Sequence, residues 1–232
     1  MALIARLRKL IPFVAILGLA ACGNQQQGST FDQVLKTVAN TVRSAPASEV
    51  TATRASLLAS GFDQPLIIVA LQEAGTRGGM LKTSVKNGIT IWRSADGHST
   101  AAFRDGVLGN TTGLSHDLYS AETKGTRAAI SSGATTSYQR VYRHLNGEGV
   151  LEVLSFSCGI APVGRETITV FDRAHATLRF DERCIAESPD AAGLVRDVKN
   201  TYWRDQSSGV IWKSRQWMSR QMGYMTVERV FN

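Results

Sequence analysis

The sequence lacks the short motifs by which most metal, redox and nucleotide sites are recognised. Its three cysteines form no CxxC pair, and its four histidines stand apart, with no HExxH pair. No GxSxG segment marks a nucleophile elbow, and the glycine-rich residues 75–79 lack the Lys-Ser/Thr of a P-loop. We therefore expect no metal and no cofactor, and we interpret residues 75–79 as a bend between strands.

Clustered charge is also lacking. The chain has 26 Lys and Arg against 19 Asp and Glu, a formal net charge of +7. The first 21 residues hold three basic and no acidic side chains, so the rest of the chain carries +4. Because the basic residues are scattered and form no Lys/Arg-rich block, we expect no nucleic-acid partner. A weak preference for acidic partners, such as an acidic polysaccharide or a phosphorylated lipid, is compatible with this charge.

No apolar run is long enough to remain as a membrane-spanning helix, and the longest lies at the N-terminus. Arg6, Arg8 and Lys9 precede this run, which covers the mostly apolar residues 11–21. At about 1.5 Å per residue it extends roughly 16 Å as a helix, against about 30 Å for a bilayer core. A basic start, a short apolar middle and small residues at the end predict a cleaved signal peptide over residues 1–21.

The residues at the expected cleavage site, Leu19-Ala20-Ala21-Cys22, resemble the lipobox of bacterial lipoproteins. In that class the cysteine thiol is acylated, and cleavage makes the cysteine the new N-terminus. The resemblance implies that Cys22 is the lipid attachment site and that its acyl chains anchor the protein in a membrane. Gly23 stands where an Asp often retains lipoproteins in the inner membrane, which favours the outer membrane, facing the periplasm. The alternative is a secreted protein with a chance cysteine.

The two other cysteines, Cys158 and Cys184, predict a disulfide because an exported protein reaches an oxidising compartment. Closing this loop would stabilise the fold by about 3.5 kcal/mol in the chain-entropy model. A simple meander over residues 150–183 would place the two cysteines two strands apart, roughly 9.5 Å, beyond the roughly 7 Å that a disulfide bridges. The bridge would then require a bend within residues 159–164 or after Cys184, and two free buried thiols are the alternative.

Helical signals are confined to the N-terminal part of the chain. Residues 22–30 are polar and are interpreted as a flexible tether. A capping box at Thr30 opens a helix that ends before Pro46, and a second helix ends at Gly61. One domain is expected to cover residues 31–232.

Strand signals dominate from residue 65 onwards. Short apolar or alternating runs are separated by turn dipeptides at Asn87-Gly88, Asp96-Gly97, Asp105-Gly106 and Asn146-Gly147. Ten or more strands are expected, with antiparallel pairing, and a sheet this wide tends to curl or close. We therefore predict a mainly β fold: a large antiparallel sheet curled into an open or closed barrel-like domain, with the two N-terminal helices packed on it.

Few residues are candidates for chemistry. Ser115, His116 and Asp117 have the residue types of a hydrolytic triad, but neighbours on a strand point to opposite faces, so we do not interpret them as catalytic.

Aromatic residues gather near the C-terminus, with arginines among them. Flat rings and guanidinium groups suit the binding of sugar faces and hydroxyls, and the alternative is that the rings fill the core. We select Arg77, Trp203, Trp212 and Arg215 as candidate residues for binding a polymer or a partner protein.

Three blocks carry a further resemblance: residues 72–97, residues 105–118, and residues 200–224 with their Asn-Thr-Tyr-Trp-Arg-Asp and Gly-Val-Ile-Trp segments. They are similar to the YjbF/GfcB family of bacterial lipoproteins, which is associated with group 4 capsule and exopolysaccharide export. Thr112 stands where the family has Arg, and Ser115 where it has Gly. The resemblance implies an outer-membrane lipoprotein with a large β fold, no known catalytic activity and an accessory role in polysaccharide secretion.

Three functions are compatible with these features. The first is a non-enzymatic accessory factor in capsule or exopolysaccharide secretion, acting on export proteins or on the polymer. The second is a periplasmic lipid- or lipoprotein-handling β module, which a wide apolar cavity with few charges would favour. The third is a polysaccharide-modifying enzyme, which needs two carboxylates about 5–10 Å apart, with Asp105, Asp117 and Asp205 as candidates.

Overall fold

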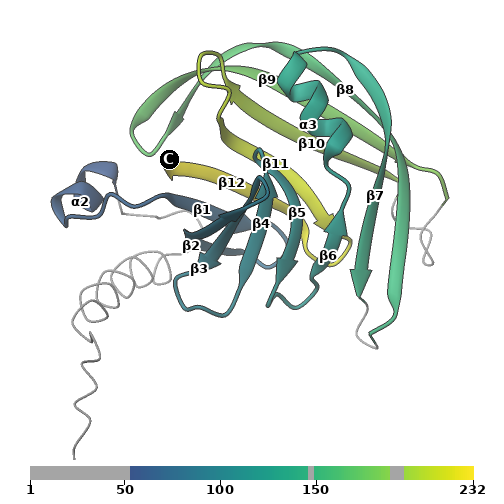
Figure 1. Ribbon diagram of the computed structural model, residues 1–232, viewed down its shortest axis with the longest axis horizontal. Helices are drawn as coiled ribbons and strands as arrows, with labels where there is room; N and C mark the ends of the chain where they lie inside the picture. Colours follow the sequence, from purple (N-terminus) through teal and green to yellow (C-terminus); the bar gives the residue numbers. More distant parts are fainter. Residues whose placement is uncertain (1–52, 146–148, 189–195) are drawn as a thin grey trace, which may run out of the picture.

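A computed structural model describes residues 53–145, 149–188 and 196–232 (Figure 1). The expected signal peptide, Cys22, the tether, the first expected helix and the Asn146-Gly147 turn lie outside these residues. Within the described ranges, no helix combines the length and the apolar character needed to cross a membrane.

Within the described residues, twelve strands form one antiparallel sheet. The strands are β1 (Leu66–Leu71), β2 (Thr76–Lys86), β3 (Ile89–Ser94), β4 (Thr100–Arg104), β5 (Val107–Thr112), β6 (Leu118–Ala121), β7 (Thr136–Leu145), β8 (Leu151–Val170), β9 (Arg173–Ala186), β10 (Asp197–Asp205), β11 (Ile211–Ser219) and β12 (Gly223–Phe231). Two helices are described with them, α2 (Arg54–Ala59) and α3 (Lys124–Ser132).

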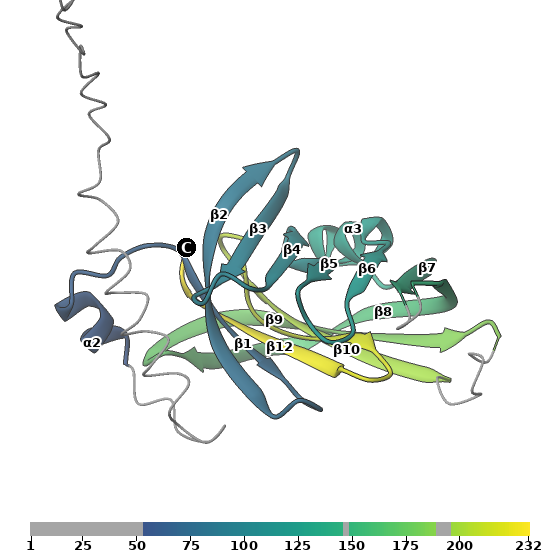
Figure 2. The ribbon, with the colours of Figure 1, turned by 90° about the horizontal axis from the view of Figure 1, so that it is seen from below.

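The sheet is an up-and-down meander that curls into a nearly closed barrel. Neighbours in sequence are neighbours in the sheet, β1 also pairs with β12, and β5 and β6 are the two ends of the order. These two end strands lie side by side (Figures 1 and 2). Side chains link them: the Leu118 N–H donates to Thr111 Oγ1 (2.9 Å), which donates to Asp117 Oδ1 (2.9 Å). The predicted curled antiparallel sheet is confirmed.

Two of the expected turn dipeptides form tight hairpins. Asn87 and Gly88 have φ of 52° and 74° between β2 and β3, and Asp105 and Gly106 have φ of 48° and 80° between β4 and β5. Positive φ at both central residues matches the right-handed twist of the flanking strands, which is why Asn-Gly and Asp-Gly are favoured there.

The long hairpin of β8 and β9 differs from the expected meander. Residues 159–164 are part of β8, which runs without a break from Leu151 to Val170 and pairs directly with β9. Cys158 and Cys184 are therefore opposite each other on neighbouring strands, and they form a disulfide with an S–S distance of 2.04 Å. The expectation that a third strand separates the two cysteines is therefore wrong.

The expected placement of the helices is also wrong in part. α2 is shorter than the second predicted helix: it begins after Thr53, whose side chain accepts the N–H of Ser56. Its Leu57 packs against the outer side of β1, in a small cluster with Leu66 and Ile68. α3 was not expected, and it lies mid-chain between β6 and β7 rather than before the sheet.

α3 packs against the barrel through one face. Ala129 and Ile130 lie in a cluster with Val107, Phe180 and Tyr202. The spacing of buried positions in α3 is helical, but the segment has few large apolar residues, so the sequence pattern gave a weak signal.

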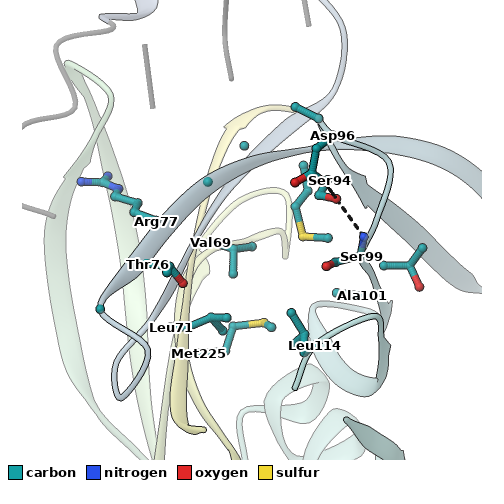
Figure 3. A pocket seen from close by; sticks show the side chains of 16 residues that line it. Val69, Leu71, Thr76, Arg77, Ser94, Asp96, Ser99, Ala101, Leu114 and Met225 are labelled. Atoms are coloured by element: carbon teal, nitrogen blue, oxygen red, sulfur yellow. Dashed lines mark hydrogen bonds between the residues drawn. The ribbon is translucent and has the colours of Figure 1, made fainter. Parts of the chain in front are cut away.

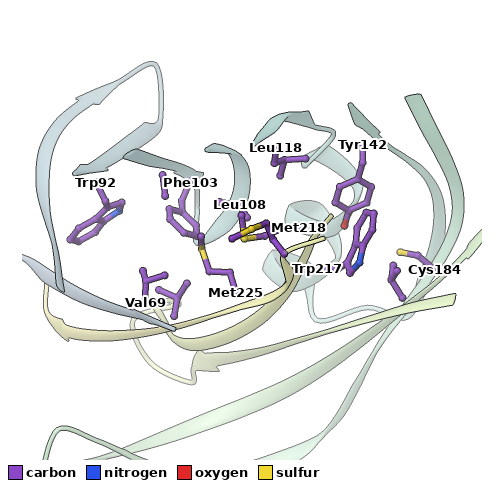
Figure 4. Close-up of a cluster of buried hydrophobic side chains, with 14 of the residues drawn as sticks. Val69, Trp92, Phe103, Leu108, Leu118, Tyr142, Cys184, Trp217, Met218 and Met225 are labelled. Atoms are coloured by element: carbon purple, nitrogen blue, oxygen red, sulfur yellow. The ribbon is translucent and has the colours of Figure 1, made fainter. Parts of the chain in front are cut away.

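The main core fills the barrel interior (Figure 4). Trp92 and Trp217 are both buried in it, with exposed fractions of 1% and 4%. The Trp217 ring meets those of Tyr142 and Phe156 edge-on, at 5.0 and 5.8 Å between centroids. The tryptophans that fill the core are therefore not those selected as binding candidates.

Candidate functional site

A row of charged and aromatic side chains crosses the outer face of the barrel. The strand registers pair Arg179 with Trp203, Trp203 with Lys213, and Lys213 with Glu228. Residues directly opposite each other share a face of the sheet. Arg77 joins the end of this row through an ion pair with Glu228 (3.1 Å). We call these five residues the outer row.

Trp203 is the centre of the outer row. Its Nε1–H donates to Glu166 Oε2 (2.9 Å), which holds the ring in one orientation. Lys213 Nζ and the guanidinium carbon of Arg179 each lie 5.8 Å from the ring centroid. Cations at this distance are attracted to the ring face. Trp203 is half-buried, so part of the ring remains accessible between two positive charges.

Acidic neighbours orient the cations of the outer row. Lys213 Nζ lies 2.8 Å from Glu228 Oε1. Arg179 donates to both carboxylate oxygens of Asp181, at 3.0 and 2.9 Å. These hydrogen bonds to Asp181 are the main reason that the pKa of Arg179 is raised. The row therefore presents fixed positive groups beside an aromatic plane, an arrangement that can bind hydroxyl-rich or anionic groups.

Arg215 lies beside the outer row. It is two residues from Lys213 along β11, its guanidinium stacks on Tyr224 (3.4 Å to the ring centroid), and its Nη2 donates to Gln72 Oε1 (2.8 Å).

Trp212 makes separate contacts. It lies at an irregularity between β10 and β11, stacks on His175 (3.9 Å between centroids) and donates from Nε1 to Asp205 Oδ2 (2.9 Å). Burial lowers the pKa of His175. Hydrogen bonds, first that of the Ser208 N–H, hold the pKa of Asp205 well below its usual range.

The four candidate residues are thus only partly brought together. Arg77 and Trp203 belong to the outer row, Arg215 is adjacent to it, and Trp212 is not part of it. The residue selection from sequence missed Lys213 and Arg179. The alternation of Lys213 with Arg215 on one strand was a usable signal, whereas the pairing of Arg179 with Trp203 depends on the register of β9 and β10.

A cavity of about 370 Å³ opens at the barrel mouth beside β1, β2 and the turn between β3 and β4 (Figure 3). Val69, Leu71, Leu114 and Met225 project into it. Arg77 contributes to the wall, but its side chain points away from the cavity.

Polar groups line the other side of this cavity and are hydrogen-bonded to one another. The Ser94 hydroxyl donates to Asp96 Oδ1 (2.6 Å), and the backbone N–H of Ser99 donates to Ser94 Oγ (2.9 Å). The N–H of His98 also donates to Asp96 Oδ1 (3.1 Å). Asp96 and His98 are therefore turn residues, at the turn that the Asp96-Gly97 dipeptide predicted.

The Ser115-His116-Asp117 segment is a structural turn. The Asp117 carboxylate accepts the backbone N–H groups of Gly113 (2.9 Å) and Leu114 (3.2 Å). Thr112 and Ser115, the two departures from the family pattern, flank Leu114, which lines the cavity. These two residues therefore affect the shape of the cavity wall rather than the outer row.

A buried ion pair lies beneath α3, whose Thr126 donates a hydrogen bond to it. Arg140 and Glu182 form an ion pair, with exposed fractions of 1% and 0% for their side chains. Glu182 also lies close to the sulfurs of Cys158 and Cys184, but these are bonded to each other and are not available to a metal ion.

Comparison with known proteins gives one family and one informative structure. A search of curated proteins finds no match. The fold is similar to a crystal structure described as that of the hypothetical lipoprotein YmcC from Escherichia coli K12, with a TM-score of 0.64 and 16% sequence identity over 74% of this chain and 86% of that one. The family model for the group 4 capsule polysaccharide lipoprotein GfcB, YjbF, matches residues 28–230. The chain therefore belongs to the YjbF family of capsule polysaccharide lipoproteins.

Proposed function

We propose that this protein is a lipid-anchored accessory factor in the secretion of a capsule or exopolysaccharide, that it is attached to the outer membrane through Cys22, and that it acts by binding rather than by catalysis. The observation that carries the proposal is the outer row, in which Trp203 lies between Arg179 and Lys213 on the outside of the barrel. We assign this row, with Arg215 beside it, to contact with the polymer or with an export protein.

The chemistry of the outer row supports this assignment. An aromatic plane can stack on the apolar face of a sugar, and neighbouring guanidinium and ammonium groups can bind hydroxyls or carboxylates. The contacts with Glu166, Asp181 and Glu228 hold these groups in place before binding. Groups that are already ordered lose less conformational freedom on binding.

The enzyme alternative has less support from the geometry. Hydrolysis of a glycosidic bond needs two carboxylates about 5–10 Å apart, facing the substrate. Asp96 is the only acidic residue that lines the cavity among the described residues. Of the candidate acids, Asp117 caps a turn and Asp205 accepts hydrogen bonds from Ser207, Ser208 and Trp212.

Deletion of the gene should reduce the amount of polysaccharide at the cell surface without abolishing growth. Expression of the Trp203→Ala variant in the deletion strain should fail to restore the surface polysaccharide. Trp203 is half-buried and outside the core, so this variant should melt within a few degrees of the native protein. If the ring is a binding hot spot, its loss weakens binding by about 2 kcal/mol, roughly thirtyfold. The measurements are surface polysaccharide in complemented cells and binding of the purified protein to the purified polymer.

Tyr119→Ala is the matched control, because Tyr119 is an exposed aromatic residue on β6, away from the outer row. It should restore secretion fully. Lys213→Gln keeps the Trp203 ring and removes one charge, so it should give an intermediate defect. A Trp203→Ala protein that folds and restores secretion as well as Tyr119→Ala would contradict the role of the outer row.

Cys22→Ala should release the protein from the membrane fraction. The variant lacks the thiol that receives diacylglycerol, so processing at the expected lipobox should also fail. Fractionation and the mass of the mature N-terminal peptide measure both effects. Unchanged fractionation with an unchanged mature mass would contradict lipid attachment at Cys22.

A further inference from the structure

We propose that the binding surface continues from the outer row past Arg215 to Tyr224, and that it takes an acidic polysaccharide over several consecutive sugar residues. We call the line from Trp203 through Arg215 to Tyr224 the outer track. The inference rests on the proposed function, because it uses the same side of the barrel. It adds the class of polymer and the length of chain that this surface would bind.

The strand registers place the outer track on one face of the sheet. Arg215 on β11 is opposite Thr201 on β10 and Thr226 on β12. Thr201 is two residues from Trp203 along its strand, so both point to the outer side of the barrel. Thr226 is likewise two residues from Tyr224. The Arg215 guanidinium lies 3.4 Å from the centroid of the Tyr224 ring, which places these two side chains together.

The two rings mark the ends of a track that is longer than one sugar. The Tyr224 hydroxyl accepts the backbone N–H of Lys199 (3.1 Å), so this end of the track lies beside Lys199. Lys199 and Trp203 are both on β10, and four residues of a strand cover roughly 13 Å. A single sugar residue would therefore reach one ring, whereas an extended chain of several residues would reach both, with Arg215 between them.

The outer track and the adjoining outer row carry more positive than negative charge. Arg77 and Lys213 share one carboxylate, that of Glu228, at 3.1 and 2.8 Å. Arg215, at the centre of the track, contacts the neutral amide oxygen of Gln72 (2.8 Å) and the aromatic ring that ends the track. This surplus favours an anionic partner. Guanidinium groups bind carboxylate and phosphate oxygens alike, so either anion on a sugar would suit Arg215.

The polar character of the outer track favours a polysaccharide over a protein partner. Thr201 and Thr226 flank Arg215, and their hydroxyl groups can exchange hydrogen bonds with sugar hydroxyls. The rings of Trp203 and Tyr224 can stack on the apolar faces of sugars. The fully buried core of a protein–protein interface is largely apolar, whereas charged and hydroxyl-bearing side chains separate the two rings here.

Binding of polysaccharide fragments to the mature chain, residues 22–232 with Cys22→Ser, tests the outer track. The probe is the surface polysaccharide of the strain that encodes the protein, partly hydrolysed and separated by length, and calorimetry measures its affinity. Affinity should rise with fragment length until a fragment reaches both rings and should then level off. Raising the salt concentration from roughly 0.1 to roughly 1 M should weaken binding, because salt screens the charges.

Two treatments of the fragments identify the anionic group. Reduction of carboxyl groups to alcohols removes carboxylates, and hydrolysis of phosphate esters removes phosphates. The treatment that removes the relevant anion should lower the affinity about tenfold, because a hydrogen bond to a charged group is lost. Full affinity after both treatments would overturn the acidic polymer. An affinity that does not depend on fragment length would overturn the extended track.

Arg215→Gln removes the central charge of the track and should weaken the binding of long fragments about tenfold. Arg215 is half-buried on the outer face, so the variant should melt as the parent does. Arg173→Gln is the matched control, because Arg173 is an exposed arginine beside the β8–β9 turn and outside the track. It should bind as the parent does. Equal weakening by both variants would reduce the interaction to net charge and overturn the track.

Tyr224→Leu removes the second ring and keeps an apolar side chain against the core, on which Tyr224 packs. This variant should bind short fragments as the parent does and should lose the gain in affinity with length. A folded Tyr224→Leu protein that keeps the full gain would contradict the second ring. If this variant does not fold, Arg215→Gln and the length series still decide the proposal.

The proposed function and this inference can fail separately. If no fragment binds the native chain while Trp203→Ala still fails to restore secretion, the polysaccharide is overturned and an export protein remains as the partner of the outer row. If fragments bind as expected while Trp203→Ala restores secretion, the outer track stands as a polysaccharide site and the proposed role of Trp203 in secretion falls.

Discussion

Replacing Glu182 with glutamine should lower the free energy of unfolding by about 3–5 kcal/mol, because it leaves the charge of Arg140 buried without its partner. Glu182 accepts hydrogen bonds from Arg140, Tyr138 and Tyr202. It also accepts from Thr126 (2.7 Å) and Asn200 (2.6 Å), so it joins α3 to β7 and β10. An amide keeps the shape of the side chain but cannot balance the guanidinium charge. Urea denaturation at neutral pH measures the loss.

A double-mutant cycle with Arg140→Met separates the pair from its surroundings. The double variant should be less destabilised than the sum of the two single variants, because neither then leaves an isolated buried charge. A Glu182→Gln protein within about 1 kcal/mol of the native one would contradict a charged, coupled pair.

The same pair predicts a loss of stability in acid. Burial by itself would raise the pKa of Glu182, but the charge of Arg140 and the hydrogen bonds from its neighbours outweigh burial and hold the pKa below its ordinary value of 4.5. A carboxyl group with a lowered pKa contributes stability above its unfolded pKa and loses it as pH falls through the folded value. The difference in stability between the native protein and Glu182→Gln should therefore be largest above pH 4.5 and shrink in more acidic solution.

Removing the disulfide by Cys158→Ala with Cys184→Ala should cost about 3.5 kcal/mol in the chain-entropy model. The two cysteines are opposite residues of the β8–β9 hairpin and are buried, at 1% and 0% exposed. The cross-link restricts the unfolded chain, and in the native state it joins strands that are already paired. Thermal melting of the oxidised protein and of the variant measures the difference.

Thiol labelling of the denatured, unreduced mature protein gives the independent check. With Cys22 replaced by Ser, no reactive thiol should appear until a reductant is added. Reduction of the native sequence should then lower the melting temperature about as much as the double alanine variant does. Two reactive thiols before reduction, or a melting temperature that does not change on reduction, would contradict a stabilising disulfide.

The sequence alone was sufficient where the signal is local. Asn87-Gly88 and Asp105-Gly106 predicted hairpins because a positive φ at two adjacent residues strongly restricts the residue types that can stand there. The turn between β8 and β9 has the same backbone conformation at Phe171 and Asp172, with φ of 46° and 62°. It contains no glycine or asparagine, so the sequence pattern predicts a hairpin in this region but places its turn about two residues too late.

Two segments were interpreted wrongly because their structure depends on tertiary contacts. The glycines and the proline within residues 159–164 suggested a bend, yet β8 continues through them because β9 supplies pairing partners along this segment, while β7 pairs with β8 as far as Ile160. α3 was missed since its short apolar face becomes stable only against Phe180 and Tyr202 of the barrel. Tertiary packing, rather than intrinsic propensity, stabilises such a helix.

The sequence by itself determined the mainly β, antiparallel character of the domain and its family, and it predicted the pairing of Cys158 with Cys184 that the structure contains. Only the tertiary structure decided which tryptophans are core and which are outside: Trp92 and Trp217 fill the barrel, whereas Trp203 lies between Arg179 and Lys213 on its surface. It also decided that the barrel closes beside β5 and β6 and leaves an aliphatic cavity at its mouth. The physical reason is that register and closure bring together residues from strands far apart in the chain, and no local pattern of residues encodes those distances.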